Sequence, residues 1–283
     1  MTAEGDRFLC ICADDFGMSE GINAAVLALL SEGRICAASC MVLRSAWPWG
    51  AGALHRLPAD GVEFGLHLEI NRPPSDSPAE PSLGGLLAAS YLRLLRPGAV
   101  QAEIREQLAR FEDALGRPPA FVDGHRHVHQ LPVVREVLLE ELASRYGTAA
   151  PWIRSTAPGA ARRRMPTKAD AIFALGGRRM AALAAQHRIP TSRGLLGIYD
   201  FRGTLAAYRK RLAGWIAACR TGDVLMCHPA IDRAPGDPIA AARQREYAAL
   251  GMLDFPVRTE AGAVFLRPFS RQPLFAAGSG INP

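Results

Sequence analysis

The chain has 283 residues, of which 49% are apolar and 21% are charged. This balance is typical of a folded globular protein and excludes a disordered or fibrous one. The formal net charge is +6, but the arginine clusters at 162–164 and 178–179 come with no nucleic-acid motif and no interleaved aromatic residues. We therefore expect solvated basic segments and no nucleic-acid partner.

The first fifteen residues, MTAEGDRFLCICADD, contain no apolar run long enough for a signal sequence or a membrane span. The expected compartment is therefore the cytoplasm, with no membrane span. Six cysteines occur without a CxxC pair, which argues against a thiolate zinc site. They are predicted to be small buried core residues with free thiols.

Short apolar runs alternate with longer amphipathic ones, which is the rhythm of repeated β–α units. The pattern predicts strands at 7–13, 37–43, 63–70, 120–123, 152–154 and 223–227. It predicts helices at 20–32 (with Ser19 as N-cap), 100–115 (closed by Gly116), 133–146, 169–187 and 204–218. The segment 72–85 is rich in proline, serine and glycine and is predicted to be a loop. With no internal repeat and no linker, residues 1–283 are expected to form one α/β domain.

Polar side chains follow four of the predicted strands. Asp14 and Asp15 follow the first strand, His67 ends the third, His125 follows the fourth and His228 follows the strand 223–227. A single histidine at a strand end is more often structural than functional. In parallel α/β folds, however, the carboxyl ends of the strands are where ligands bind. Four such ends carrying aspartate or histidine therefore indicate one shared site.

The run DGHRHVH at 123–129 contains three alternating histidines. In a continuous strand they would share one face at about 6.6 Å per step, so His125 and His129 would be about 13 Å apart. Bonds from zinc to histidine nitrogen are about 2.1 Å long, so one cation reaches all three only if the backbone turns. The favoured arrangement takes one ligand from the run, which leaves His127 and His129 for substrate contacts, orientation or support of the ligands.

Asp14 and Asp15 are adjacent and would point to opposite faces of a strand. They are therefore expected to do different work, one binding a metal and the other handling a proton. The glycine of Phe16-Gly17 allows a sharp turn that brings both toward one pocket. The alternative, a helix-capping role for the pair, is disfavoured by the nearby histidines.

Four motifs in this order carry a family resemblance: ADDFG at 13–17, GLHL at 65–68, DGHRHVH at 123–129 and CHP at 227–229. Together they resemble the YdjC-like carbohydrate deacetylases, which include chitooligosaccharide deacetylase and hopanoid-biosynthesis deacetylase-like proteins. The resemblance implies a distorted, TIM-like (β/α) barrel, a site for one divalent cation, Zn²⁺ or Mg²⁺, and a homodimer. The sequence departs from the pattern at Arg126, where relatives often have another histidine, which would alter substrate contacts.

Mapped motif by motif, the resemblance implies that Asp15, His67 and His125 hold the metal and that Asp14 is the catalytic base. The implied reaction removes an N-acetyl group from an acetylated amino sugar or glycoconjugate, either a small molecule or an oligosaccharide. Activated water would attack the amide carbonyl while the base takes a proton.

Expelling the amine requires a proton, for which His228 is the first candidate acid and His127 the second. Asp123, His129 and Arg154 are the candidate substrate-binding residues. The sequence leaves open whether Asp123 or Arg154 instead orients one of the reacting groups.

Two other functions remain as alternatives. One is hydrolysis of an amide or ester that is not an acetylated sugar; the other is metal or carbohydrate binding without catalysis, although binding needs neither Asp14 nor His228. The loop 72–85 either overhangs the pocket or is a solvated connector. Trp47 and Trp49 either stack on a sugar or, as the favoured interpretation, pack in the interior.

Overall fold

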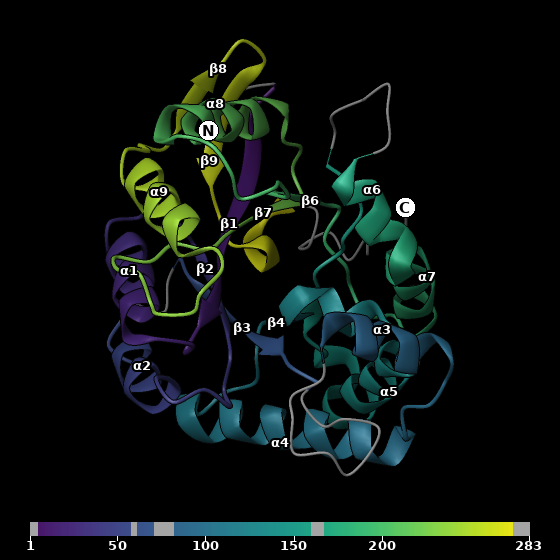
Figure 1. Cartoon of the computed structure of the whole chain (residues 1–283). Coiled ribbons are helices and arrows are strands. Elements are labelled where there is room, and N and C mark those ends of the chain that lie inside the picture. Colours follow the sequence, from purple (N-terminus) through teal and green to yellow (C-terminus); the bar gives the residue numbers. More distant parts are fainter. Residues whose placement is uncertain (1–4, 58–60, 71–81, 160–166, 274–283) are drawn as a thin grey trace.

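The computed structural model describes residues 5–57, 61–70, 82–159 and 167–273, and it has strands at its centre with helices around them (Figure 1). Seven strands form a parallel sheet in the order β5-β4-β3-β2-β1-β7-β6. They are β1 (Arg7–Phe16), β2 (Ala37–Cys40), β3 (Glu63–Leu68), β4 (Phe121–Gly124), β5 (Trp152–Ile153), β6 (Gly194–Leu196) and β7 (Asp223–Cys227). Two further strands, β8 (Val257–Thr259) and β9 (Gly262–Leu266), form a hairpin, and β9 pairs in parallel with the first residues of β1.

Helices lie on the outside of the sheet (Figure 1). They are α1 (Glu20–Ser31), α2 (Trp47–Leu54), α3 (Leu83–Tyr91), α4 (Pro97–Leu115), α5 (Val134–Tyr146), α6 (Lys168–Ile172), α7 (Arg178–Gln186), α8 (Leu205–Ala218) and α9 (Ala240–Leu250). Isolated bridges from Ile153 to Thr191 and from Pro158 to Leu195 link the two ends of the sheet. The predicted α/β, TIM-like architecture is therefore confirmed as a parallel half-barrel.

Local sequence signals explain several element boundaries. β1 is buried at nine of its ten positions, as expected for a strand covered on both faces of a parallel sheet. The hydroxyl of Ser19 accepts the N–H of Ile22 and starts α1, which confirms the predicted N-cap. Gly116 closes α4 with a left-handed φ of 65°, a conformation that glycine adopts without strain.

The run at 125–130 forms a 3₁₀ turn, η1 (His125–Gln130), which is the backbone turn that the sequence left open after the strand. Two expectations about secondary structure are wrong. The predicted helix 169–187 is interrupted by a π-turn, η3 (Phe173–Gly177), because Gly176 has a φ of 134°. Most of the predicted loop 72–85 lies outside the described residues, but α3 begins within it at Leu83, where the Ser82 hydroxyl caps the helix.

The interior confirms the expectation for the cysteines, since all six are buried with free thiols. Trp47 is also buried and stacks on Phe111 with ring centroids 6.0 Å apart, which is the packing role favoured from the sequence. The same prediction is wrong for Trp49, which is 54% exposed. Among the helices that the structure describes, none is long and apolar enough to cross a membrane.

Candidate metal centre

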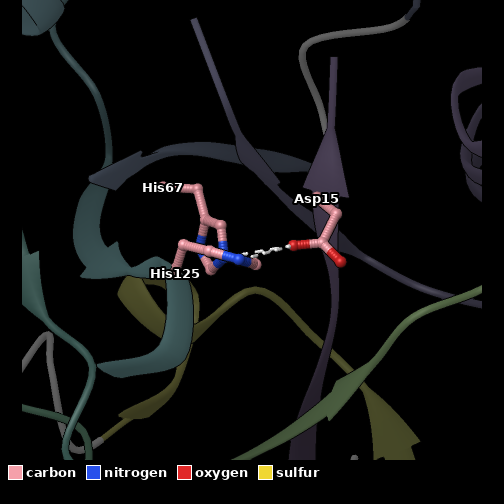
Figure 2. Close-up of side chains that lie close together, drawn as sticks. All are labelled: Asp15, His67 and His125. Carbon is pink, nitrogen blue, oxygen red and sulfur yellow. Dashed lines mark ion pairs between the residues drawn. The ribbon is translucent and has the colours of Figure 1, made fainter. Parts of the chain in front are cut away.

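Asp15, His67 and His125 meet at the carboxyl ends of β1, β3 and β4 (Figure 2). The Asp15 Oδ1 atom lies 3.4 Å from His67 Nε2 and 3.3 Å from His125 Nδ1. Ligand atoms of a tetrahedral zinc ion are about 3.4 Å apart when each bond is about 2.1 Å. Within the described chain, this oxygen is buried and accepts no hydrogen bond. The three donors therefore fit a single divalent cation.

An irregularity in β1 turns the backbone at the second of the two adjacent aspartates. The register between β1 and β2 shifts between Ala13 and Phe16, and Asp15 has a φ of 65°. This left-handed conformation is uncommon outside glycine and is most often found in asparagine and aspartate. The turn expected at Phe16-Gly17 thus begins one residue earlier, at Asp15 itself.

The turn after β4 separates the three histidines of the DGHRHVH run. Arg126 and His127 both have positive φ angles, of 52° and 61°. His125 therefore points at Asp15 with its side chain 28% exposed. His129 is fully buried, and its Nε2 donates to the Arg154 carbonyl over 3.1 Å. Of these histidines, the structure brings only His125 into the cluster of metal donors.

His67 is oriented by a carboxylate behind it. Its Nδ1 lies 2.7 Å from Asp123 Oδ1 and 3.0 Å from the Ser39 hydroxyl, which also bonds to Asp123. An Nδ1–H that donates to a carboxylate leaves Nε2 free as a metal ligand. Burial would lower the pKa of His67, but Asp123 and Asp14 raise it to about 10. The same negative charge attracts a cation.

Asp14 is held by an arginine and not by the metal donors. Arg154 approaches it with two hydrogen bonds, Nη1 to Oδ1 at 2.6 Å and Nη2 to Oδ2 at 2.8 Å. Arg154 Nη2 also lies 2.9 Å from Asp123 Oδ2. Burial would raise the pKa of Asp14, but Arg154 outweighs it and lowers that pKa to about 2. Asp14 is therefore a carboxylate at neutral pH and can accept a proton.

His228 lies on the other side of Asp14. Its Nε2 is 4.0 Å from Asp14 Oδ2, and its Nδ1 is 4.0 Å from Glu246 Oε2. Glu246 also accepts the backbone N–H of His228 at 2.6 Å and the hydroxyl of Tyr199 at 2.7 Å. Burial lowers the pKa of the second candidate acid, His127, well below its ordinary value. His127 is thus neutral at neutral pH, which favours His228 as the proton donor.

The three candidate substrate-binding residues lie beneath the surface of the site. Asp123, His129 and Arg154 are each 0% exposed. Their contacts, with His67, with the Arg154 carbonyl and with Asp14, support the orienting role that the sequence left open.

Sequence analysis missed two charged residues of this site, both on α9. Arg243 Nη2 donates to Asp15 Oδ2 at 2.6 Å, and its Nε donates to Asp237 at 2.6 Å. Glu246, one turn later on the same helix, supports His228. Arg243 thus occupies one oxygen of Asp15 and leaves Oδ1 to face the two histidines. The available signal was their spacing of three residues, which places both on one helix face.

Removing the Arg154 charge should destabilise the protein. An Arg154→Gln variant leaves two buried carboxylates without their shared cation, so we expect a loss of about 3–5 kcal/mol in the free energy of unfolding. Urea titration measures it. The matched control is Arg110→Gln, because Arg110 and its partner Glu106 are 52% and 37% exposed, and its loss should stay below about 1 kcal/mol. Equal losses in both variants would contradict the account given for Arg154.

Comparison with known proteins assigns the chain to a family. The family model described as "YdjC-like protein" matches residues 8–256. The chain belongs to the YdjC-like family. It is 32% identical over 163 residues to a carbohydrate deacetylase of Geobacillus stearothermophilus. This alignment covers 57% of this chain and 64% of that protein. It is 30% identical over 149 residues to a chitooligosaccharide deacetylase of Enterobacter sp. (strain 638). That alignment covers 51% of this chain and 58% of the relative.

These matches therefore span less than two thirds of the length of either relative. A solved structure from Enterococcus faecalis V583, described as a proposed cellobiose-phosphate cleavage protein, superposes on this YdjC-like chain with a TM-score of 0.58. It is 19% identical and covers 87% of this chain and 90% of that one. At this identity the likeness concerns the fold. The region matched to the family contains all the site residues described above, α9 included.

Proposed function

We propose that this YdjC-like chain is a metal-dependent hydrolase that removes N-acetyl groups from acetylated amino sugars or glycoconjugates. The observation that carries the proposal is the pairing of the Asp15–His67–His125 donor set with a separate, ionised Asp14. A metal-binding protein without catalysis needs the first and not the second. The deacetylases among its relatives support the choice of substrate class.

A cation held by Asp15, His67 and His125, either Zn²⁺ or Mg²⁺, would supply Lewis-acid polarisation of the amide carbonyl and activation of water. Asp14 accepts the proton of the attacking water, and Arg154 keeps its carboxylate ionised and fixed in direction. His228 gives a proton to the departing amine. Glu246 accepts a hydrogen bond from the backbone N–H of His228 and so fixes the position of that residue. Asp123 fixes the tautomer of His67.

Four further parts of the proposal rest on the sequence and the family resemblance. They are a single domain over residues 1–283, a homodimer, a cytoplasmic location and an oligosaccharide or small-molecule substrate.

The reaction is tested with a panel of N-acetylated sugars, including chitooligosaccharides, and with N-acetylated peptides and simple esters. Each is incubated with Zn²⁺, Mg²⁺, Mn²⁺ or Co²⁺, and released acetate is measured. We expect acetate from at least one amino sugar and less from the other substrates. Faster release from a peptide or ester would replace the sugar with the alternative substrate class, and no turnover of any substrate would reject hydrolysis.

Metal dependence gives a separate expected result. Dialysis against a chelator should abolish acetate release, and addition of the preferred cation should restore it, because the carbonyl and the water both need the cation. The control is a thermal melt of the chelated protein. It should remain folded, since the apolar core does not involve the donor set. Full activity after complete metal removal, verified by elemental analysis, would contradict the proposal.

A further inference from the structure

Exposed apolar side chains are concentrated around α3. Eight large apolar side chains are exposed among the described residues, and four of them lie between positions 83 and 94: Leu83, Tyr91, Leu92 and Leu94. Leu92, at 69%, and Leu94, at 59%, are the two most exposed of the eight. The other four are spread over separate parts of the chain. Contiguous exposed apolar groups of this kind mark interaction sites, whereas single ones are ordinary.

The backbone presents these residues at a rigid turn. After α3 ends at Tyr91, the N–H of Leu94 bonds to the Ala89 carbonyl at 2.8 Å, and the N–H of Arg93 bonds to the Ser90 carbonyl at 3.1 Å. This pair of bonds is the Schellman motif, which usually has glycine at the left-handed position. Here Arg93 occupies it with a φ of 55°, so the chain keeps a strained residue at this turn.

Buried side chains and one hydrogen bond attach this turn to the rest of the protein, while its apolar tip remains exposed. Leu86 and Leu95 are buried on either side of it, and the Ser90 hydroxyl donates to the Pro132 carbonyl at 2.7 Å. In a Schellman motif the apolar residue after the left-handed position commonly packs back on the helix. Leu94 instead stays 59% exposed. We call Tyr91, Leu92, Arg93, Leu94 and Arg96 the α3 tip.

Between residues 82 and 102 the charged side chains are all arginine. No aspartate or glutamate occurs between residues 82 and 102, and α3 itself carries no charged residue. Arg93 and Arg96 are exposed, and neither forms an ion pair within the described part of the chain. Two copies that met tip to tip would bring these four arginines together, and like charges repel. An anionic surface is the complement.

We propose that the α3 tip docks on an anionic membrane surface. Tyr91, Leu92 and Leu94 enter the boundary between headgroups and acyl chains, where leucine gains burial and tyrosine keeps its hydroxyl in water. Arg93 and Arg96 lie at the level of the lipid phosphates. The contact is peripheral and reversible. Figure 1 shows α3 among the helices that lie outside the strands.

The test is co-sedimentation of the whole protein with vesicles of phosphatidylcholine alone or of equal parts phosphatidylcholine and phosphatidylglycerol, at low and high salt. We expect binding to the anionic vesicles that salt weakens. Leu92→Ser/Leu94→Ser should lower the partition coefficient at least about tenfold, and so should Arg93→Gln/Arg96→Gln.

Two control pairs match these variants in chemistry. Leu175→Ser/Met252→Ser removes apolar groups that are 41% and 57% exposed elsewhere, and Arg209→Gln/Lys210→Gln removes two exposed positive charges on α8. Both should bind vesicles like the unaltered chain. Thermal melts verify that every variant is folded, and hydrolysis of a water-soluble substrate should be unchanged in all of them.

Three results would overturn the proposal: no binding to anionic vesicles, equal losses in the control pairs, or unchanged binding in the Leu92→Ser/Leu94→Ser variant. A dimer in solution that this variant dissociates would also overturn it, by assigning the tip to a second copy of the chain. None of these results bears on the metal centre, so failure here is distinct from failure of the proposed hydrolase.

Discussion

An Asp14→Asn variant is expected to bind metal like the unaltered chain and to lose about a thousandfold in kcat. Asparagine keeps the shape of the side chain and can still accept a hydrogen bond from Arg154, but it cannot take a proton from water. Asp14 lies outside the donor set of Asp15, His67 and His125, so the Kd for the cation should stay within a few-fold. Calorimetric titration with metal and acetate release from a sugar measure the two quantities separately.

The matched control for this exchange is Asp223→Asn. Asp223 is also fully buried, but it begins β7 and hydrogen-bonds to the backbone of Arg220, so it lies at the opposite end of the strand from His228. Its replacement tests whether any buried aspartate-to-asparagine change lowers kcat. If Asp14→Asn lost the cation instead of turnover, Asp14 would be a ligand, and the division of labour between the two aspartates would be wrong.

The donor set could be predicted because the carboxyl ends of parallel strands meet at the same edge of a sheet. β1, β3 and β4 run in the same direction, so polar residues at their carboxyl ends lie at one edge however far apart they are in the chain. Asp15, His67 and His125 follow this rule. What the strand pattern could not provide was the choice among His125, His127 and His129.

That choice depends on a turn with no local signal. Arg126 and His127 both adopt left-handed conformations, which are uncommon outside glycine. Gly176 of the π-turn packs so closely on the carbonyl of Gln130 that a Cβ there would lie 2.3 Å from the oxygen. The end of the turn, at Gln130, thus packs against a glycine that follows it by more than forty positions in the chain, and sequence periodicity does not reveal such a contact.

Helix α9 was missed for a different reason. Its buried positions are Ala242, Arg243, Glu246, Ala249 and Leu250. They recur at helical spacing, but two of them are charged, so the apolar stripe by which an amphipathic helix is recognised is interrupted. The charges are buried because the site uses them, Arg243 for Asp15 and Glu246 for His228. Here the functional requirement conceals the structural signal.

Replacing His125 with alanine is the second change for which we expect a large effect, and the quantity that it changes is the affinity for the cation. His125 contributes one of the three donors, and the two that remain, Asp15 and His67, cannot enclose the ion. We expect the Kd for the preferred metal to rise more than about a hundredfold, since loss of a direct ligand should exceed the 10–100-fold cost typical of losing a supporting residue. Acetate release at low metal concentration should fall in parallel.

The side chain of His125 is 28% exposed, so its removal should leave the metal-free protein as stable as before, which a thermal melt in chelator verifies. The matched control is His127→Ala, in the same turn and only two residues away. It should leave the Kd unchanged, because His127 is not part of the cluster of donors. If the two variants weakened binding equally, the turn would place both histidines on the cation. If only His127→Ala did so, the ligand would have been assigned to the wrong histidine of the run.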